Sequence, residues 1–74
     1  MRRISDPDGR TWEVVLGRAS WGAHAALFVP VGHDSPVRQR DLSAASMAEA
    51  MAQIDEMDDE ALRKLLEEAR IKDS

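Results

Sequence analysis

The sequence predicts an α+β domain in which an N-terminal antiparallel sheet of three or four strands is followed by two amphipathic helices packed on one face. Residues 12–16 and 25–29 are apolar runs of strand length, the first β-branched and aromatic, the second apolar at every position. Gly17 and Gly22 lie between them, as in a hairpin. After Ser43 the apolar residues recur with a helical period instead.

Length and composition are those of a small globular domain. The 74 residues are expected to form one domain, 1–74, with a β-meander over 1–41 and a helical pair over 43–72. Cysteine is absent, so neither a disulfide nor a thiolate metal site is expected, and the expected location is a reducing cytoplasm. No signal peptide is expected, because no apolar stretch follows the two N-terminal arginines, and no window approaches the roughly 18 apolar residues of a membrane span.

The two halves of the chain differ in charge, although the net charge is −4. Residues 1–40 carry six arginines and four acidic residues, whereas residues 41–74 carry ten acidic residues and four basic ones. The predicted sheet is therefore basic and the predicted helices are acidic. An acidic helix pair would suit a basic partner, although such an excess of acids is ordinary for surface helices.

A first strand over residues 2–5 is expected because a strong turn signal, Asp-Pro-Asp-Gly, follows it. This strand should fold back onto the second one and bring Ile4 near Trp12. Side chains alternate along a strand, so Trp12, Val14 and Leu16 share one face, which is the better candidate for the core.

The third strand, residues 24–31, is apolar on both faces, which predicts that it lies between two layers or against a partner. Pro30 has no amide hydrogen, so pairing on that side should stop just before it, or the strand should run along an edge there. Residues 37–41 alternate weakly and predict a fourth strand. Arg38 and Arg40 would share one of its faces, which fits an edge strand guarded by charge.

A first helix over about residues 46–56 is predicted by Ser46 and Glu49, which have the spacing of a capping box. Asp58 is a suitable N-cap for a second helix that runs to about Arg70. Each helix has an apolar stripe. The first stripe consists of Met47, Ala50, Met51 and Ile54, and the second of Leu62, Leu65, Leu66 and Ala69.

No pattern in the sequence indicates catalysis or metal binding. His24, His33 and Asp34 could bind a metal ion, but no third ligand has a recognisable spacing. Ser35 beside Asp34 is typical of a turn, and the acids of residues 55–60 lack the spacing of a calcium loop. We therefore expect a non-enzymatic protein with no catalytic residue, no cofactor and no metal.

Nucleic-acid binding is the alternative function that the arginines suggest. An antiparallel sheet can present arginine and aromatic side chains to phosphates and bases. Against this hypothesis, the chain is acidic, with a sequence pI near 5.0, and has no tyrosine. The candidate residues are Arg2, Arg3, Arg10, Arg18, Arg38 and Arg40, with Trp21 among the side chains to test.

The preferred function is a small intracellular protein-protein interaction module that forms a homodimer or binds another protein. If both helices cover one face, the sheet keeps more apolar surface than they can hide. The interface is predicted on the sheet face that carries Val15, Ala26 and Phe28, with Trp21 in the adjacent turn. Helices splayed over both faces, or a loop of residues 32–36 folded over the sheet, would remove this surface.

Overall fold

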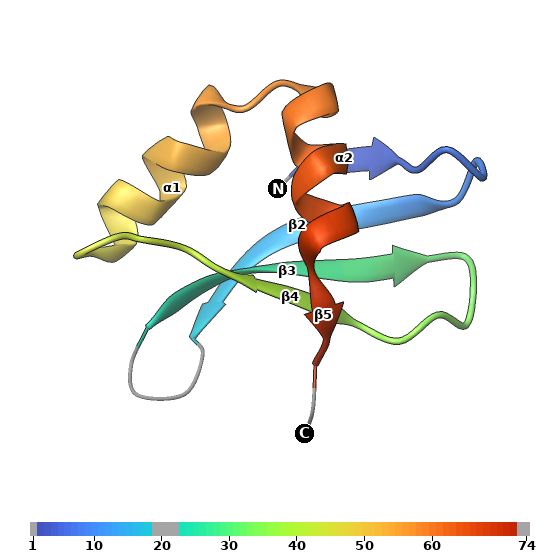
Figure 1. Cartoon of the computed structure of the whole chain (residues 1–74), viewed down its shortest axis with the longest axis horizontal. Coiled ribbons are helices and arrows are strands. Elements are labelled where there is room, and N and C mark those ends of the chain that lie inside the picture. Colours follow the sequence, from blue (N-terminus) through green and yellow to red (C-terminus); the bar gives the residue numbers. More distant parts are fainter. Residues whose placement is uncertain (1, 19–22, 73–74) are drawn as a thin grey trace.

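The computed structural model describes residues 2–18 and 23–72, and Figure 1 shows the course of the chain. The predicted α+β class is confirmed, because an antiparallel sheet at the N-terminus is followed by two helices. The elements are β1 (Arg2–Ser5), β2 (Thr11–Arg18), β3 (His24–Val31), β4 (Arg38–Asp41), α1 (Met47–Glu56), α2 (Asp59–Glu68) and β5 (Arg70–Ile71).

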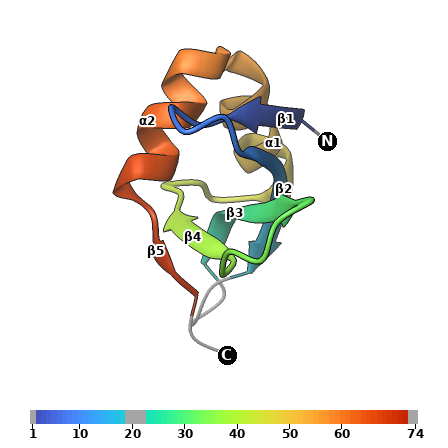
Figure 2. The same ribbon diagram turned by 90° about the vertical axis from the view of Figure 1, so that its right-hand side faces the viewer.

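The sheet has five strands rather than three or four, in the order β1-β2-β3-β4-β5, with every neighbouring pair antiparallel. The additional strand is β5, which lies beside β4 below α2 in Figure 2. After α2, Ala69 is extended and the chain pairs Arg70 with Gln39. Pairing with β4 therefore overrides the helical spacing at Arg70. β4 lies between two strands, so the prediction that it forms an edge is wrong.

The turn between β1 and β2 forms as its sequence predicts. Gly9 has a positive φ of 84°, and its amide donates to the Asp6 carbonyl oxygen at 3.0 Å. The Asp6 carboxylate accepts hydrogen bonds from the backbone amides of Asp8 and Arg10, at 3.0 and 2.8 Å. This turn sets the register in which Ile4 lies opposite Trp12, as predicted.

β3 pairs with β2 over more residues than it pairs with β4. With β2 the ladder extends to Val31, but with β4 it ends at Phe28. The ladder with β4 thus stops two residues before Pro30, which has no amide hydrogen to donate. This outcome confirms the prediction for the proline.

Both helices begin at the predicted caps. Ser46 Oγ accepts a hydrogen bond from the Glu49 amide at 3.2 Å, and the Glu49 carboxylate accepts one from the Ala45 amide at 3.1 Å. Asp58 Oδ1 accepts from the Ala61 amide at 2.8 Å. These bonds satisfy amides that have no partner within the helix. Within the described ranges, neither helix is long and apolar enough to cross a membrane.

One hydrophobic core joins residues of the sheet and of both helices. The apolar stripe of α2 is confirmed, since Leu62 and Leu66 are buried in this core. The stripe of α1 is only half confirmed, because Met47 and Met51 are 40% and 45% exposed. The core consists of Ile4, Trp12, Val14, Ala26, Phe28, Leu42, Ala50, Ile54, Leu62 and Leu66.

Candidate protein interface

The strand register divides the sheet residues between two faces. Val14 lies opposite Phe28 and Val15 lies opposite Leu27, so even-numbered positions of β1 to β4 share one face and odd-numbered positions share the other. The even positions supply the core. The odd positions define a surface that we call the odd face, which consists of Arg3, Ser5, Thr11, Glu13, Val15, Gly17, Ala25, Leu27, Val29, Val31, Gln39 and Asp41, with Arg70 of β5 opposite Gln39.

The odd face has an apolar centre. Val15, Leu27, Val29 and Val31 are all partly exposed, and none belongs to the hydrophobic core. Leu27 lies close against the neighbouring strand, because a Cβ atom on Gly17 would come within 2.6 Å of the Leu27 Cδ1 atom. The absence of a side chain at Gly17 therefore lets Leu27 lie across the sheet.

Two pairs of opposite charges flank this apolar centre. Arg3 and Glu13 lie opposite each other on β1 and β2. On the same face, toward the opposite edge of the sheet, Arg70 of β5 and Asp41 of β4 form a salt bridge of 3.7 Å, and both side chains are exposed. These are the charged residues of the odd face, so the face is neutral at pH 7, whereas the whole chain carries −4.

The predicted grouping of interface residues is wrong. Phe28 and Ala26 have no exposed surface and belong to the core, whereas Val15 faces the opposite side of the sheet. The error arises because both faces of the third strand are apolar. Its composition therefore does not determine which alternate set of its residues faces the core. Sequence reasoning also did not single out Leu27 and Val29, which are partly exposed on the same face as Val15. Trp21 lies outside the described residues.

The six candidate arginines do not share a face. The Arg2 guanidinium donates to the Met57 carbonyl oxygen and to the Asp59 carboxylate, the latter at 2.6 Å, and so connects β1 to the start of α2. The Arg38 guanidinium lies 5.4 Å from the centroid of the Trp12 ring. Nucleic-acid binding stays a prediction, but the structure does not bring all six arginines to one surface, and Arg2 and Arg38 are engaged by other residues of the chain. Arg2, Arg18, Arg38 and Arg40 occupy even positions, Arg3 is on the odd face, and Arg10 is exposed just before β2 begins.

Trp12 connects a polar cluster that includes His33, whose ring is edge-on to the indole at a centroid distance of 4.9 Å. His33 Nε2 lies 2.9 Å from the Thr11 carbonyl oxygen, which can only accept, so Nε2 carries a hydrogen. In the neutral ring, Nδ1 then accepts from the Ser35 hydroxyl at 2.7 Å. The cluster fastens the loop after β3 to β2, and a carbonyl rather than a carboxylate orients the ring.

The other histidine, His24, is almost fully buried at the start of β3. Its Nδ1 atom has no hydrogen-bond partner among the residues that the structure describes. Over residues 2–18 and 23–72, no three histidine, aspartate or glutamate side chains gather as metal ligands.

Asp6 links this cluster to the first turn, because its carboxylate also accepts from the Trp12 indole N–H at 3.0 Å. This hydrogen bond, supported by the amides of Arg10 and Asp8, outweighs desolvation and lowers the pKa of Asp6 below its ordinary value of 3.8. The folded state thus binds the proton less tightly than the unfolded chain. The ionised carboxylate stabilises the fold above pH 3.8, and this contribution is lost as the pH falls through the lowered pKa.

We therefore expect Asp6→Asn to lower the melting temperature at pH 7 and the difference from wild type to shrink toward pH 2. Thermal unfolding of both proteins, followed by circular dichroism, measures this at each pH. A difference that stays constant between pH 7 and pH 2 would assign no role to the charge of the carboxylate.

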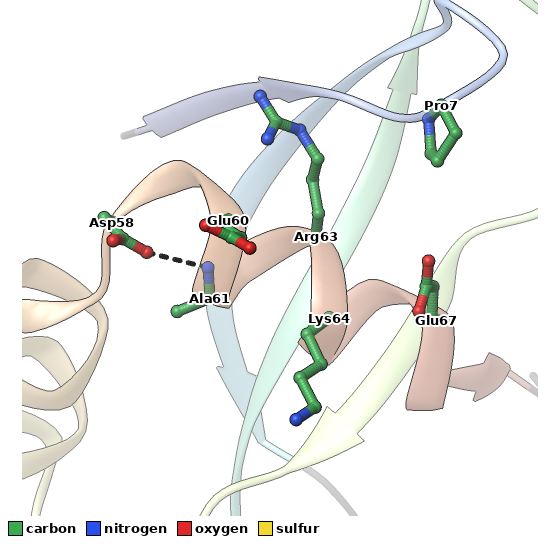
Figure 3. Close-up of a pocket in the computed structure, with 7 residues that line it drawn as sticks. All are labelled: Pro7, Asp58, Glu60, Ala61, Arg63, Lys64 and Glu67. Atoms are coloured by element: carbon green, nitrogen blue, oxygen red, sulfur yellow. Dashed lines mark hydrogen bonds between the residues drawn. The ribbon is translucent and has the colours of Figure 1, made fainter.

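A broad, open hollow beside α2 has charged walls (Figure 3). Asp58 and Ala61 form the helix cap there, and Arg63 Nε donates to the Ser5 carbonyl oxygen at 2.7 Å. Three of the lining residues thus cap α2 or connect it to β1, and the charged side chains of the hollow do not converge on a common point (Figure 3). Its lining consists of Pro7, Asp58, Glu60, Ala61, Arg63, Lys64 and Glu67.

Comparisons with known proteins identify no relative: no family model matches the sequence, and neither the curated proteins nor the solved structures contain a significant match. The fold and the surface define an α+β domain with an apolar, partly exposed sheet face.

Proposed function

We propose that this small, non-enzymatic protein is an interaction module that forms a homodimer by packing the odd faces of two copies together. In this proposal α1 and α2 both cover the even face, and the odd face is open in the single chain. The observation that carries the proposal is the group of partly exposed side chains Val15, Leu27, Val29 and Val31, which lies outside the core.

The charges of the odd face favour a second copy as the partner. Two chains that each carry −4 repel one another through most of their surface, but the odd face itself is neutral. A two-fold axis that runs between the two faces and exchanges their flanks would bring the Arg3 and Glu13 pair of one copy toward the Asp41 and Arg70 pair of the other. Each pair contains both signs, so both copies can form the same contacts.

The expected affinity is modest. Complete burial of an exposed valine or leucine contributes about 1.5 to 3 kcal/mol, and these side chains are already partly buried, so each contributes a fraction of that. In the dimer each of these side chains is buried in both copies, so its contribution enters twice. The summed free energy must exceed an association cost of roughly 4 to 15 kcal/mol. We therefore expect a dissociation constant in the micromolar range.

Size-exclusion chromatography with light scattering tests the dimer. At high micromolar concentration, wild type should have twice the chain mass of 8.2 kDa, and Leu27→Asp should have the mass of one chain while keeping its circular dichroism spectrum. Met51→Asp is the matched control, because Met51 is exposed on α1 and away from the odd face, so this variant should remain a dimer. A monomeric wild type, or a Leu27→Asp dimer, contradicts the proposal.

A further inference from the structure

The turn between β1 and β2 contains a chemically labile pair of residues, Asp8 and Gly9. When glycine follows aspartate, no side chain hinders the glycine nitrogen from attacking the aspartate Cγ atom. Asp8 is the only aspartate of the sequence that is followed by glycine. Both residues are exposed, and a Cβ atom built on Gly9 would meet no heavy atom of the described residues within 4 Å. The surrounding structure therefore leaves space for a reaction between them.

The reaction is a condensation followed by a hydrolysis. The Gly9 nitrogen forms a bond to Cγ of the protonated Asp8 carboxyl group. The carboxyl hydroxyl and the amide hydrogen leave as water, and a five-membered succinimide ring results. Water then opens the ring at either carbonyl and gives aspartate or isoaspartate. The mass is unchanged, but in isoaspartate the backbone runs through Cβ and Cγ and is one atom longer.

The hydrogen bonds of the turn oppose this reaction. The Gly9 amide donates to the Asp6 carbonyl oxygen at 3.0 Å, and it must break this bond to attack Asp8. Asp6 Oδ1 accepts from the backbone amides of Asp8 and Arg10, at 3.0 and 2.8 Å, and so restrains the turn on both sides of the labile bond. Asp6 cannot react in the same way itself, because the residue that follows it, Pro7, has no amide hydrogen.

We propose that Asp8 is a site of spontaneous isomerisation to isoaspartate, and that the Asp6 carboxylate controls the rate by holding the turn closed. The reaction proceeds from the open turn, so its rate follows the fraction of molecules in which the turn is open. The additional backbone atom disturbs the register that this turn sets, in which Ile4 lies opposite Trp12. β1 also connects to α2 through Arg2, so the change at Asp8 loosens the contact between the sheet and that helix.

Peptide mapping by mass spectrometry with electron-transfer fragmentation tests the proposal, because it distinguishes isoaspartate from aspartate at equal mass. The full chain and a synthetic peptide of residues 2–13 are incubated in parallel at pH 7. The peptide lacks the rest of the sheet, so its turn is not held closed. We expect isoaspartate at position 8 in both, forming at least about tenfold more slowly in the folded chain. Equal rates, or no isoaspartate at position 8 of the chain after the peptide has reached equilibrium, would overturn the proposal.

Variants of the chain separate the turn from the stability of the whole fold. Asp6→Ala removes the acceptor of both turn amides and should isomerise at least about threefold faster than wild type. Asp6→Asn keeps an uncharged and weaker acceptor, so its rate should lie between those two. Trp12→Phe removes the indole hydrogen bond to Asp6 but leaves both turn amides bonded, and should isomerise at the wild-type rate. Acceleration in Trp12→Phe as large as that in Asp6→Ala, or no acceleration in either Asp6 variant, would show that Asp6 does not protect the turn.

Discussion

Replacing Phe28 with alanine is expected to destabilise the fold by about 3 to 5 kcal/mol, the usual cost of removing a large buried aromatic side chain. Phe28 has no exposed surface, lies opposite Val14, and shares the core with residues of both helices. A domain this small has a total stability of only about 5 kcal/mol, so the variant should be largely unfolded. Urea denaturation followed by circular dichroism measures the loss.

The neighbouring residue provides a matched control. Val29 lies on the odd face, outside the core, and Val29→Ala should cost less than about 1 kcal/mol in dilute protein. The comparison separates two adjacent positions of one strand by the face that each occupies. A loss in Val29→Ala as large as that in Phe28→Ala would invalidate the assignment of the two faces.

Trp12 is the second position at which a large effect is expected. Trp12→Ala should cost about 3 to 5 kcal/mol, because the ring is buried and connects the Asp6 carboxylate, His33 and Arg38. Trp12→Phe keeps most of the apolar volume but removes the indole N–H, and should cost about 1 kcal/mol for the lost hydrogen bond. Denaturation midpoints of both variants, compared with wild type, measure the two contributions.

A double-mutant cycle isolates that bond. In an Asp6→Asn background, Trp12→Phe should cost less than it does in wild type, because the charged acceptor is already absent. If the two substitutions are additive, the indole and the carboxylate contribute independently, and the hydrogen bond is not what couples the turn to the core.

Local signals were sufficient for most of the fold. The Asp-Pro-Asp-Gly turn, the Ser46 and Asp58 caps and strands β1 to β4 were predicted from residues close together in the sequence, and short-range hydrogen bonds close the turn and the caps. β5 could not be predicted in this way. Arg70 and Ile71 continue a helical spacing, and only their pairing with Gln39 and Arg38, about thirty residues earlier in the chain, makes them a strand.

The prediction of the candidate interface depended on the register of the third strand, that is, on which of its residues face the core. The second strand had its core face correctly assigned, but the third strand is apolar on both sides, and a shift of one residue exchanges its faces. One available signal was the size of Phe28, the largest side chain of that strand, which packs best on the face that already holds Trp12 and Val14. Applying it would have placed Leu27 and Val29 beside Val15, on the odd face.

Thiol accessibility tests the central claim, that a partly exposed apolar face lies opposite the core and pairs two copies. The natural sequence has no cysteine, so Val14→Cys and Val15→Cys introduce single probes at adjacent positions of β2. We expect Val14→Cys to react slowly with a thiol reagent at every protein concentration, whereas Val15→Cys should react quickly in dilute protein and become protected as the concentration rises into the high micromolar range. Equal protection of both in dilute protein, or a Val15→Cys rate that is independent of concentration, would contradict it.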